Sequence, residues 1–144
     1  MWVFTVYGFF SVVNTTSSRS SNGELMSEDQ VVEVRSRHRQ HLECLMDRFE
    51  EQIGDAVILG YDDVNSAYAR RDYEYRIIIN AEDWVHLGAM LSADVTYPSF
   101  RGEVKEAVAE DPRLAKTPYI EQLQSVYSSV QNEDRWAVES KTLN

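Results

Sequence analysis

The spacing of apolar residues along the chain predicts which segments form strands and which form helices. From Trp2 to Val13 nearly every residue is β-branched or aromatic, which predicts a strand buried on at least one face. Gly8 interrupts this run, and a glycine inside a strand marks a bend, so the run forms one kinked strand or two short ones. Residues 14–28 are rich in Ser, Thr, Asn and Gly, which predicts a flexible loop.

Three further segments have strand character, at residues 30–35, 56–61 and 72–79. The last of them, DYEYRIII, alternates most clearly. Because successive side chains of a strand point to opposite faces, one face is expected to carry every second residue of this strand. These residues are Tyr73, Tyr75, Ile77 and Ile79, with Asp72, Glu74, Arg76 and Ile78 on the other face.

Helical spacing dominates the remaining sequence. Residues 37–53 are expected to form a helix, because Leu42, Leu45, Met46, Phe49 and Ile53 recur on one helical face. Asn80 is a typical N-cap for a helix over residues 81–91, whose buried stripe is Trp84, Leu87, Met90 and Leu91. Two later helices are bounded by prolines: Pro98 marks the start of the first, Pro112 its end, and Pro118 the start of the last helix. The expected inner face of the last helix is Ile120, Leu123, Val126 or Tyr127, and Val130.

This order of elements predicts an α+β fold with a four-stranded, mostly antiparallel sheet, helices packed on one face and a helical C-terminal third. Such a sheet is ferredoxin-like or a rearranged version of that fold. We expect residues 1–132 to form a single α+β domain, with 14–28 as a flexible loop, and residues 133–144 to form a frayed polar tail.

The charge of the chain narrows the classes of partner. The formal net charge is −10, with 24 acidic and 14 basic residues, which disfavours general attraction to nucleic acid or to an anionic membrane. The apolar run at the start is shorter than the roughly 20 residues needed to cross a bilayer. We expect a cytoplasmic protein, in a bacterial cytosol or an infected host cell, with no membrane partner.

No residue pattern indicates catalysis, so we predict a protein that is not an enzyme and has no cofactor and no metal. Cys44 is the single cysteine, and its apolar helical setting predicts a buried thiol. His38 and His41 have a spacing that could ligate a metal, but a third ligand is not evident. A metal-independent hydrolase with His38 or His41 as base remains a weaker alternative.

The stretch YGFFSVV resembles an aromatic RNA-binding strand, but three features favour core packing instead. Tyr7 occupies the place where Lys or Arg begins the RNA-binding signature, the stretch precedes the first helix, and the chain is acidic. We therefore expect these aromatic side chains to be buried.

Basic residues gather in the stretch RSRHRQH at residues 35–41. Together with residues of the predicted strand 72–79, this stretch could bind a phosphate or an acidic partner surface. The candidate binding residues are Arg35, Arg37, Arg76, Tyr75 and Tyr73. The alternative is a solvated helix turn whose arginines pair with Glu33, Glu43 or Asp47.

Several motifs together resemble a family of short, uncharacterised proteins of bacteria and their phages. The family opens with W-[IV]-F-T-x-x-G-[FY]-[FY]-S and carries a central DYxYR strand; here these are residues 2–11 and 72–76. The helix of Trp84, leading to D-x-x-Y-x-x-F at residues 94–100, also fits. Val6 and Arg101 depart from the basic residue and the lysine expected there. The resemblance implies a bacterial or phage origin and names no chemistry.

These observations favour a non-enzymatic interaction protein, for example a phage or mobile-element factor that binds and inhibits a host protein such as a defence component. The partner is then another protein, and a homodimer is a further possible assembly. The alternative is a nucleotide-binding or RNA-binding module that uses an Arg- and Tyr-bearing face of the sheet.

Overall fold

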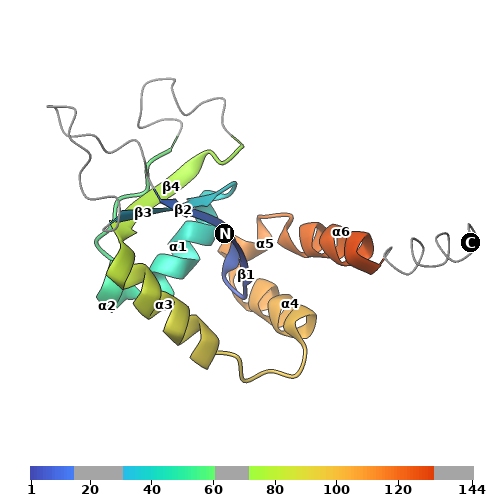
Figure 1. Cartoon of the computed structure of the whole chain (residues 1–144). Helices are drawn as coiled ribbons and strands as arrows, with labels where there is room; N and C mark the ends of the chain where they lie inside the picture. The colour runs from blue at the N-terminus through green and yellow to red at the C-terminus, as the bar shows by residue number, and fades with distance from the viewer. Residues whose placement is uncertain (15–30, 61–71, 132–144) are drawn as a thin grey trace, which may run out of the picture.

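The computed structural model describes residues 1–14, 31–60 and 72–131, which contain one four-stranded sheet (Figure 1). The strands lie side by side in sequence order, and each is antiparallel to the next. They are β1 (Trp2–Thr5), β2 (Gly8–Asn14), β3 (Val31–Ser36) and β4 (Tyr75–Asn80). The predicted α+β fold with an antiparallel sheet is confirmed.

Six helices accompany the sheet in these ranges, and the part that follows β4 is helical. They are α1 (Arg39–Arg48), α2 (Glu50–Ile53), α3 (Ala81–Ala93), α4 (Phe100–Glu110), α5 (Pro112–Ala115) and α6 (Tyr119–Gln131). Among the described residues, no helix is both long enough and apolar enough to span a bilayer. The predicted loop at 14–28 and tail at 133–144 lie, apart from Asn14, outside the described residues.

The main core lies between one face of the sheet and helices α1 and α3. Strand alternation brings apolar residues of β2, β3 and β4 to this face, where Val34 pairs with both Val12 and Ile77. The buried residues are Phe10, Val12, Val34, Leu42, Leu45, Phe49, Ile53, Ile58, Ile77, Ile79 and Leu87. The predicted stripe of α3 is confirmed, since Trp84, Met90 and Leu91 pack against Leu87 and the rest of this core.

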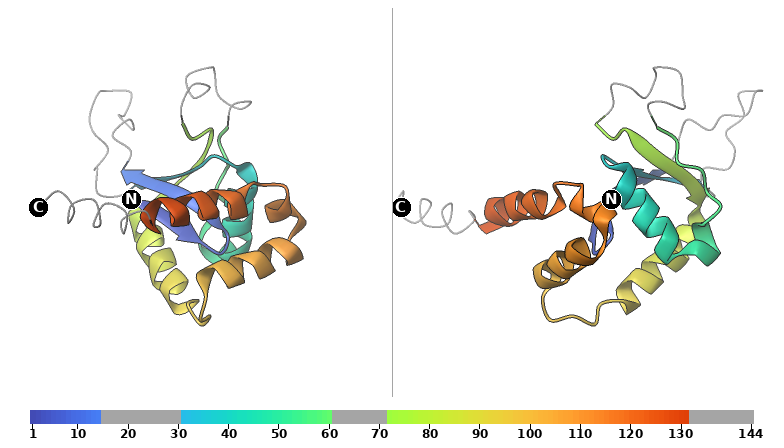
Figure 2. Two further views of the ribbon diagram at one scale, coloured as in Figure 1. Left: turned by 90° about the vertical axis from the view of Figure 1, so that its right-hand side faces the viewer. Right: turned by 180° about the vertical axis from the view of Figure 1, so that it is seen from behind.

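A second, smaller core lies on the other side of the β1–β2 hairpin. Phe4 and Phe9 are paired across the two strands and their rings stack, with centroids 4.6 Å apart. They pack against Val104 of α4 and against Tyr119 and Leu123 of α6. The hairpin therefore lies between α1 on one side and α4 to α6 on the other (Figure 2). The prediction that helices pack on one face of the sheet is right for α1 and α3. The C-terminal helices α4 and α6 pack on the other side of the hairpin and form the second core.

The sheet has four strands, as predicted, but one predicted strand is not among them. The run from Trp2 to Val13 is two short strands joined by a tight turn, which is the second of the two predicted alternatives. Segment 56–61 is not a strand within the described residues: Leu59 forms a single bridge to Arg76 through two backbone hydrogen bonds of 2.8 and 2.9 Å. Leu59 thus covers the outer edge of β4 at one position, Arg76.

The helix predicted over residues 37–53 is divided at Phe49. This residue leaves the helical conformation (φ −115°, ψ 41°) and its ring is buried in the main core. In α6 the predicted inner face is right for Ile120 and Leu123. Val126, Tyr127 and Val130 are exposed, because α6 runs away from the sheet (Figure 1). Asn80 is the N-cap of α3, but its side chain makes no capping hydrogen bond.

Candidate binding surfaces

The predicted arginine site lies on the sheet face opposite α1. Arg35 and Arg76 are directly opposite each other on β3 and β4, so their side chains lie side by side on the same face of the sheet. Arg76 is only 2% exposed, forms an ion pair with Glu33 of β3 and donates a hydrogen bond of 2.9 Å to the carbonyl of Tyr73. Its guanidinium is therefore committed to contacts inside the protein.

Arg35 and Arg37 both approach the ring of Tyr73. Their guanidinium carbons lie 4.8 and 5.6 Å from the ring centroid, within the range of cation–π attraction. Arg35 also donates a hydrogen bond of 2.7 Å to the hydroxyl of Ser11, and its Nε is buried without a hydrogen-bond partner among the described residues. Arg37 is exposed, whereas Tyr73 is 8% exposed. The tyrosine ring thus presents little area for a stacked base.

Tyr75 does not join the other predicted residues. It pairs with Ser36 and packs against the main core, on the face that carries α1. Tyr73 precedes β4 and lies beside Phe9 on the opposite face, with ring centroids 6.3 Å apart. The prediction that Tyr73 and Tyr75 share a face is therefore wrong, because strand alternation begins only at Tyr75. Four of the five predicted residues gather on one face.

The aromatic residues of YGFFSVV face the interior. Phe10 is fully buried, Phe9 belongs to the second core, and Tyr7 packs against Phe49 with ring centroids 6.0 Å apart. The expectation that these rings fill cores is confirmed, and they do not form an open stacking platform.

The hydroxyl of Tyr7 joins the hairpin turn to the ends of two helices. It donates a hydrogen bond of 3.0 Å to Asp94 at the end of α3 and accepts one of 3.1 Å from Arg48 at the end of α1. Arg48 also forms an ion pair of 2.7 Å with Asp94. Burial, followed by the hydrogen bond to Asp94, raises the pKa of Tyr7, so the phenol stays protonated.

A half-open groove of about 440 Å³ begins beside Tyr7 and Asp94 and follows β1. β1 and the hairpin turn form one side, and α3 and the segment leading into α4 form the other; Figure 1 shows β1 facing the space between these helices. Along α3 the lining is largely apolar, from Trp84, Val85, Gly88 and Leu91. Val85 and Val95 at its border are 70% and 60% exposed.

The sequence did carry a signal for this groove. Val85 and Val95 are apolar residues that lie off the predicted buried stripe of α3, and the first strand, WVFT, has no charged residue. Neither signal says that the two segments meet, because they are about 80 residues apart in sequence and only the fold brings them together.

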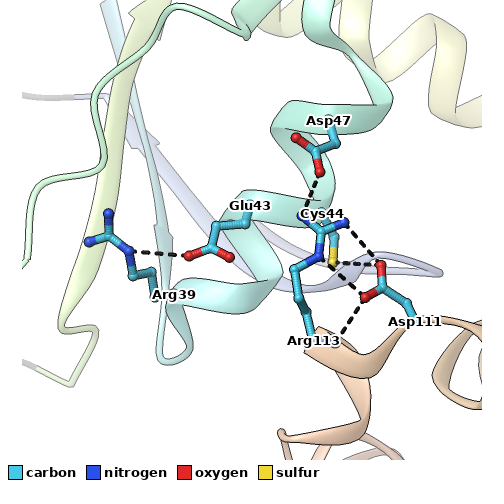
Figure 3. A network of polar contacts seen from close by, with 6 residues as sticks. All are labelled: Arg39, Glu43, Cys44, Asp47, Asp111 and Arg113. Atoms are coloured by element: carbon cyan, nitrogen blue, oxygen red, sulfur yellow. Dashed lines mark hydrogen bonds and ion pairs between the residues drawn. The ribbon is translucent and has the colours of Figure 1, made fainter.

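A separate polar network connects α1 to α5 (Figure 3). Arg113 pairs with Asp47 at 2.5 Å and with Asp111 at 3.0 Å, and Asp111 caps α5 through the backbone N–H of Arg113. The thiol of Cys44 lies 3.5 Å from the Asp111 carboxylate. Burial raises the pKa of Cys44 to about 12, so this cysteine is a neutral thiol and a poor nucleophile at neutral pH.

The two histidines of the predicted basic stretch are close together, with ring centroids 5.0 Å apart. His41 is buried, and burial lowers its pKa to about 4. Within the described ranges, no three His, Cys, Asp or Glu side chains lie together as a metal would require.

Comparison of the chain with protein-family models, curated proteins and solved structures found no match. A functional proposal therefore depends on the geometry of these surfaces.

Proposed function

We propose that this protein is a non-enzymatic interaction protein that binds another protein and inhibits it. The groove along β1 carries the proposal, because it is apolar, half-open and bordered by exposed valines at positions 85 and 95. Exposed apolar grooves with polar borders are typical of protein-binding sites. The resemblance to bacterial and phage proteins favours a phage or mobile-element factor whose partner is a host protein, such as a defence component.

The electrostatics support a protein partner more than a nucleic acid. The net charge of −10 repels polyanions, and two of the candidate arginines, Arg35 and Arg76, already bind Ser11 and Glu33. Tyr7 and Asp94, which line the groove, are hydrogen-bonded to each other, and Asp94 also forms an ion pair with Arg48.

The test is partner capture with the full chain in lysate of a bacterial host. Gly88→Phe fills the groove, because nothing lies within 4 Å of the Cβ position at Gly88. Glu106→Phe, at an exposed position of α4 outside the groove, is the matched control. We expect a stoichiometric partner that the wild type and the control retain and Gly88→Phe loses. Recovery of no stoichiometric partner contradicts the proposal.

A second candidate function is binding of RNA or a nucleotide by the sheet face. The observation in its favour is that exposed Arg37 and half-buried Arg35 both flank Tyr73. Its test is fluorescence anisotropy of a labelled RNA oligomer at low salt, with Arg37→Ala as the variant. Binding that weakens with added salt and with this substitution supports it; the absence of salt-dependent binding rejects it.

A further inference from the structure

The outer edge of β1 is unpaired in the described structure. β1 is the end strand of the sheet, and Met1 and Val12 exchange two backbone hydrogen bonds of 2.8 Å across β1 and β2. In an antiparallel pair such bonded positions alternate with non-bonded ones. The positions hydrogen-bonded to β2 are therefore Met1, Val3 and Thr5, and the N–H and C=O groups of Trp2 and Phe4 point away from β2, toward the free edge.

Within the described residues, the two edges of the sheet differ in whether another segment pairs with them. At the β4 edge, Leu59 pairs with Arg76 and covers part of the strand. The β1 edge, WVFT, carries none of the lysines, prolines or bulges that commonly protect an exposed edge. Trp2 on this strand is also 71% exposed. An edge of this kind is a template for one more strand.

The groove lies along the same edge, and its shape limits what can enter. β1 contributes Val3, Phe4 and Thr5, while Gly88 of α3 leaves open space on the opposite side. Glu103 of α4 also lines the groove. An extended chain fits between a strand edge and two helices. A second copy of this protein fits poorly, because its own β1 is flanked by the same helices and both copies carry the same net charge of −10.

We propose that the groove binds an extended segment of the partner protein, which adds to β1 as a fifth strand. This inference rests on the proposed function and specifies how the partner is recognised. Main-chain hydrogen bonds to Trp2 and Phe4 supply affinity, and the apolar wall of α3 accepts every second side chain.

The segment is basic as well as apolar. The charged side chains that line the groove are Asp94 and Glu103, and the α-amino group of Met1, which also lines it, donates a hydrogen bond to the carbonyl of Val12. Asp94 is paired with Arg48, whereas Glu103 makes no ion pair within the described ranges. A lysine or arginine between the apolar positions of the bound strand complements Glu103 and the overall negative field.

The probe is a labelled, acetylated octapeptide, TVKVTVKT, with TVEVTVET as its charge-reversed counterpart, each titrated into the full chain. Trp2→Pro removes the outward N–H of β1 and leaves the bonds to β2, because proline is tolerated on an edge strand where the N–H faces solvent. Trp2→Ala is the matched control, since it removes the same side chain and keeps the N–H. Far-UV circular dichroism and the melting temperature establish that both variants are folded.

We expect the lysine peptide to bind, and Trp2→Pro to weaken binding about two- to tenfold relative to Trp2→Ala, as the loss of one strand hydrogen bond predicts. The glutamate peptide binds more weakly than the lysine peptide. Hydrogen exchange at the Trp2 and Phe4 amides slows when the peptide is bound. Equal binding by the two variants, equal binding of the two peptides, or no binding by the wild type overturns the inference.

Two measurements separate this inference from the proposed function. If Trp2→Pro captures the same stoichiometric partner as Trp2→Ala, the protein binds a partner but not by strand addition. If the peptide results hold and no partner is recovered, the site stands and the proposed function fails. A dimer seen by sedimentation equilibrium in the wild type and lost in Trp2→Pro assigns the edge to a second copy and overturns the peptide proposal.

Discussion

His41 in α1 and Thr117 before α6 form a buried hydrogen bond, with 3.1 Å between Nε2 and Oγ1. The Thr117 hydroxyl donates to the carbonyl of Leu114 at 2.8 Å, so its oxygen accepts from the histidine. Nε2 of His41 therefore carries the proton, and Nδ1 accepts a hydrogen bond of 3.3 Å from the backbone N–H of Phe9. One neutral imidazole thus connects β2, α1 and the C-terminal helices.

The neutral state of His41 predicts a loss of stability in mild acid. Burial, and then the nearby His38, lower the pKa of His41 from 6.5 to about 4. The unfolded chain takes up this proton near pH 6.5, whereas the folded protein does so only near pH 4. The contribution of neutral His41 to the free energy of unfolding is therefore complete above pH 6.5. It is lost as the pH falls toward 4, and the loss is about 3 kcal/mol. Urea unfolding at a series of pH values measures it.

Two variants isolate this effect. His41→Gln is expected to lower stability at pH 7.5 and to flatten the dependence between pH 4 and 6.5. His86→Gln, at an exposed position of α3, is expected to leave both unchanged. A wild-type slope that persists in His41→Gln would show that another group is responsible.

The two glycines at positions 8 and 88 are expected to respond in opposite ways to alanine. Gly8 has φ +144°, and a Cβ there would lie 2.3 Å from Cγ of His41. Gly8→Ala should therefore cost about 2–5 kcal/mol through strain and overpacking. Gly88 lies within α3 with open space around it, so Gly88→Ala should stabilise by about 0.5–1 kcal/mol. Chemical denaturation of the pair tests both signs, and a neutral Gly8→Ala would contradict the close packing of the hairpin on α1.

Arg76 and Glu33 form a buried ion pair, and we expect removal of one partner alone to destabilise the folded protein. Arg76→Met leaves Glu33 buried beside an apolar chain, and we expect a loss of about 3–5 kcal/mol. The double variant Glu33→Leu with Arg76→Met should regain part of this loss. Arg39→Met is the control, because its pair with Glu43 at 3.2 Å is solvent-exposed and worth less than about 0.5 kcal/mol. Equal costs for the two arginines would contradict the assignment.

Cys44 should resist alkylation in the folded protein. Its side chain is buried and its pKa is raised to about 12, so little thiolate exists at pH 8. We expect labelling by iodoacetamide to be at least about 100-fold slower than in the urea-unfolded chain, following the thiolate fraction and the burial. Mass spectrometry of timed samples measures both rates. Similar rates in the two states would indicate that α1 and α5 separate readily.

Much of the architecture follows from local pattern. The alternation in residues 75–79 predicts β4, and the stripe of Trp84 to Leu91 predicts α3. The prolines at 98, 112 and 118 predict where the later helices begin or end, because all of these signals act within a few residues. The pattern failed where a local preference met a long-range contact. Residues 56–60 have the composition of a strand, yet the described part forms a single bridge at Leu59.

The candidate sites depended more on tertiary structure. Sequence alone placed Arg35 and Arg37 in one group, because they are neighbours in a single basic stretch, and Arg76 and the two tyrosines were added from a second predicted strand. That Arg76 faces Glu33, that Tyr73 lies under the other two arginines, and that Tyr75 is on the other face depend on strand register. The groove between β1 and α3 depends on how distant elements pack, and no local pattern encodes that. The sequence by itself determined the elements and the acidic character of the chain. Packing decided which polar groups bond to one another inside the protein and which sheet edge is unpaired among the described residues, because both are set by contacts between residues far apart in sequence.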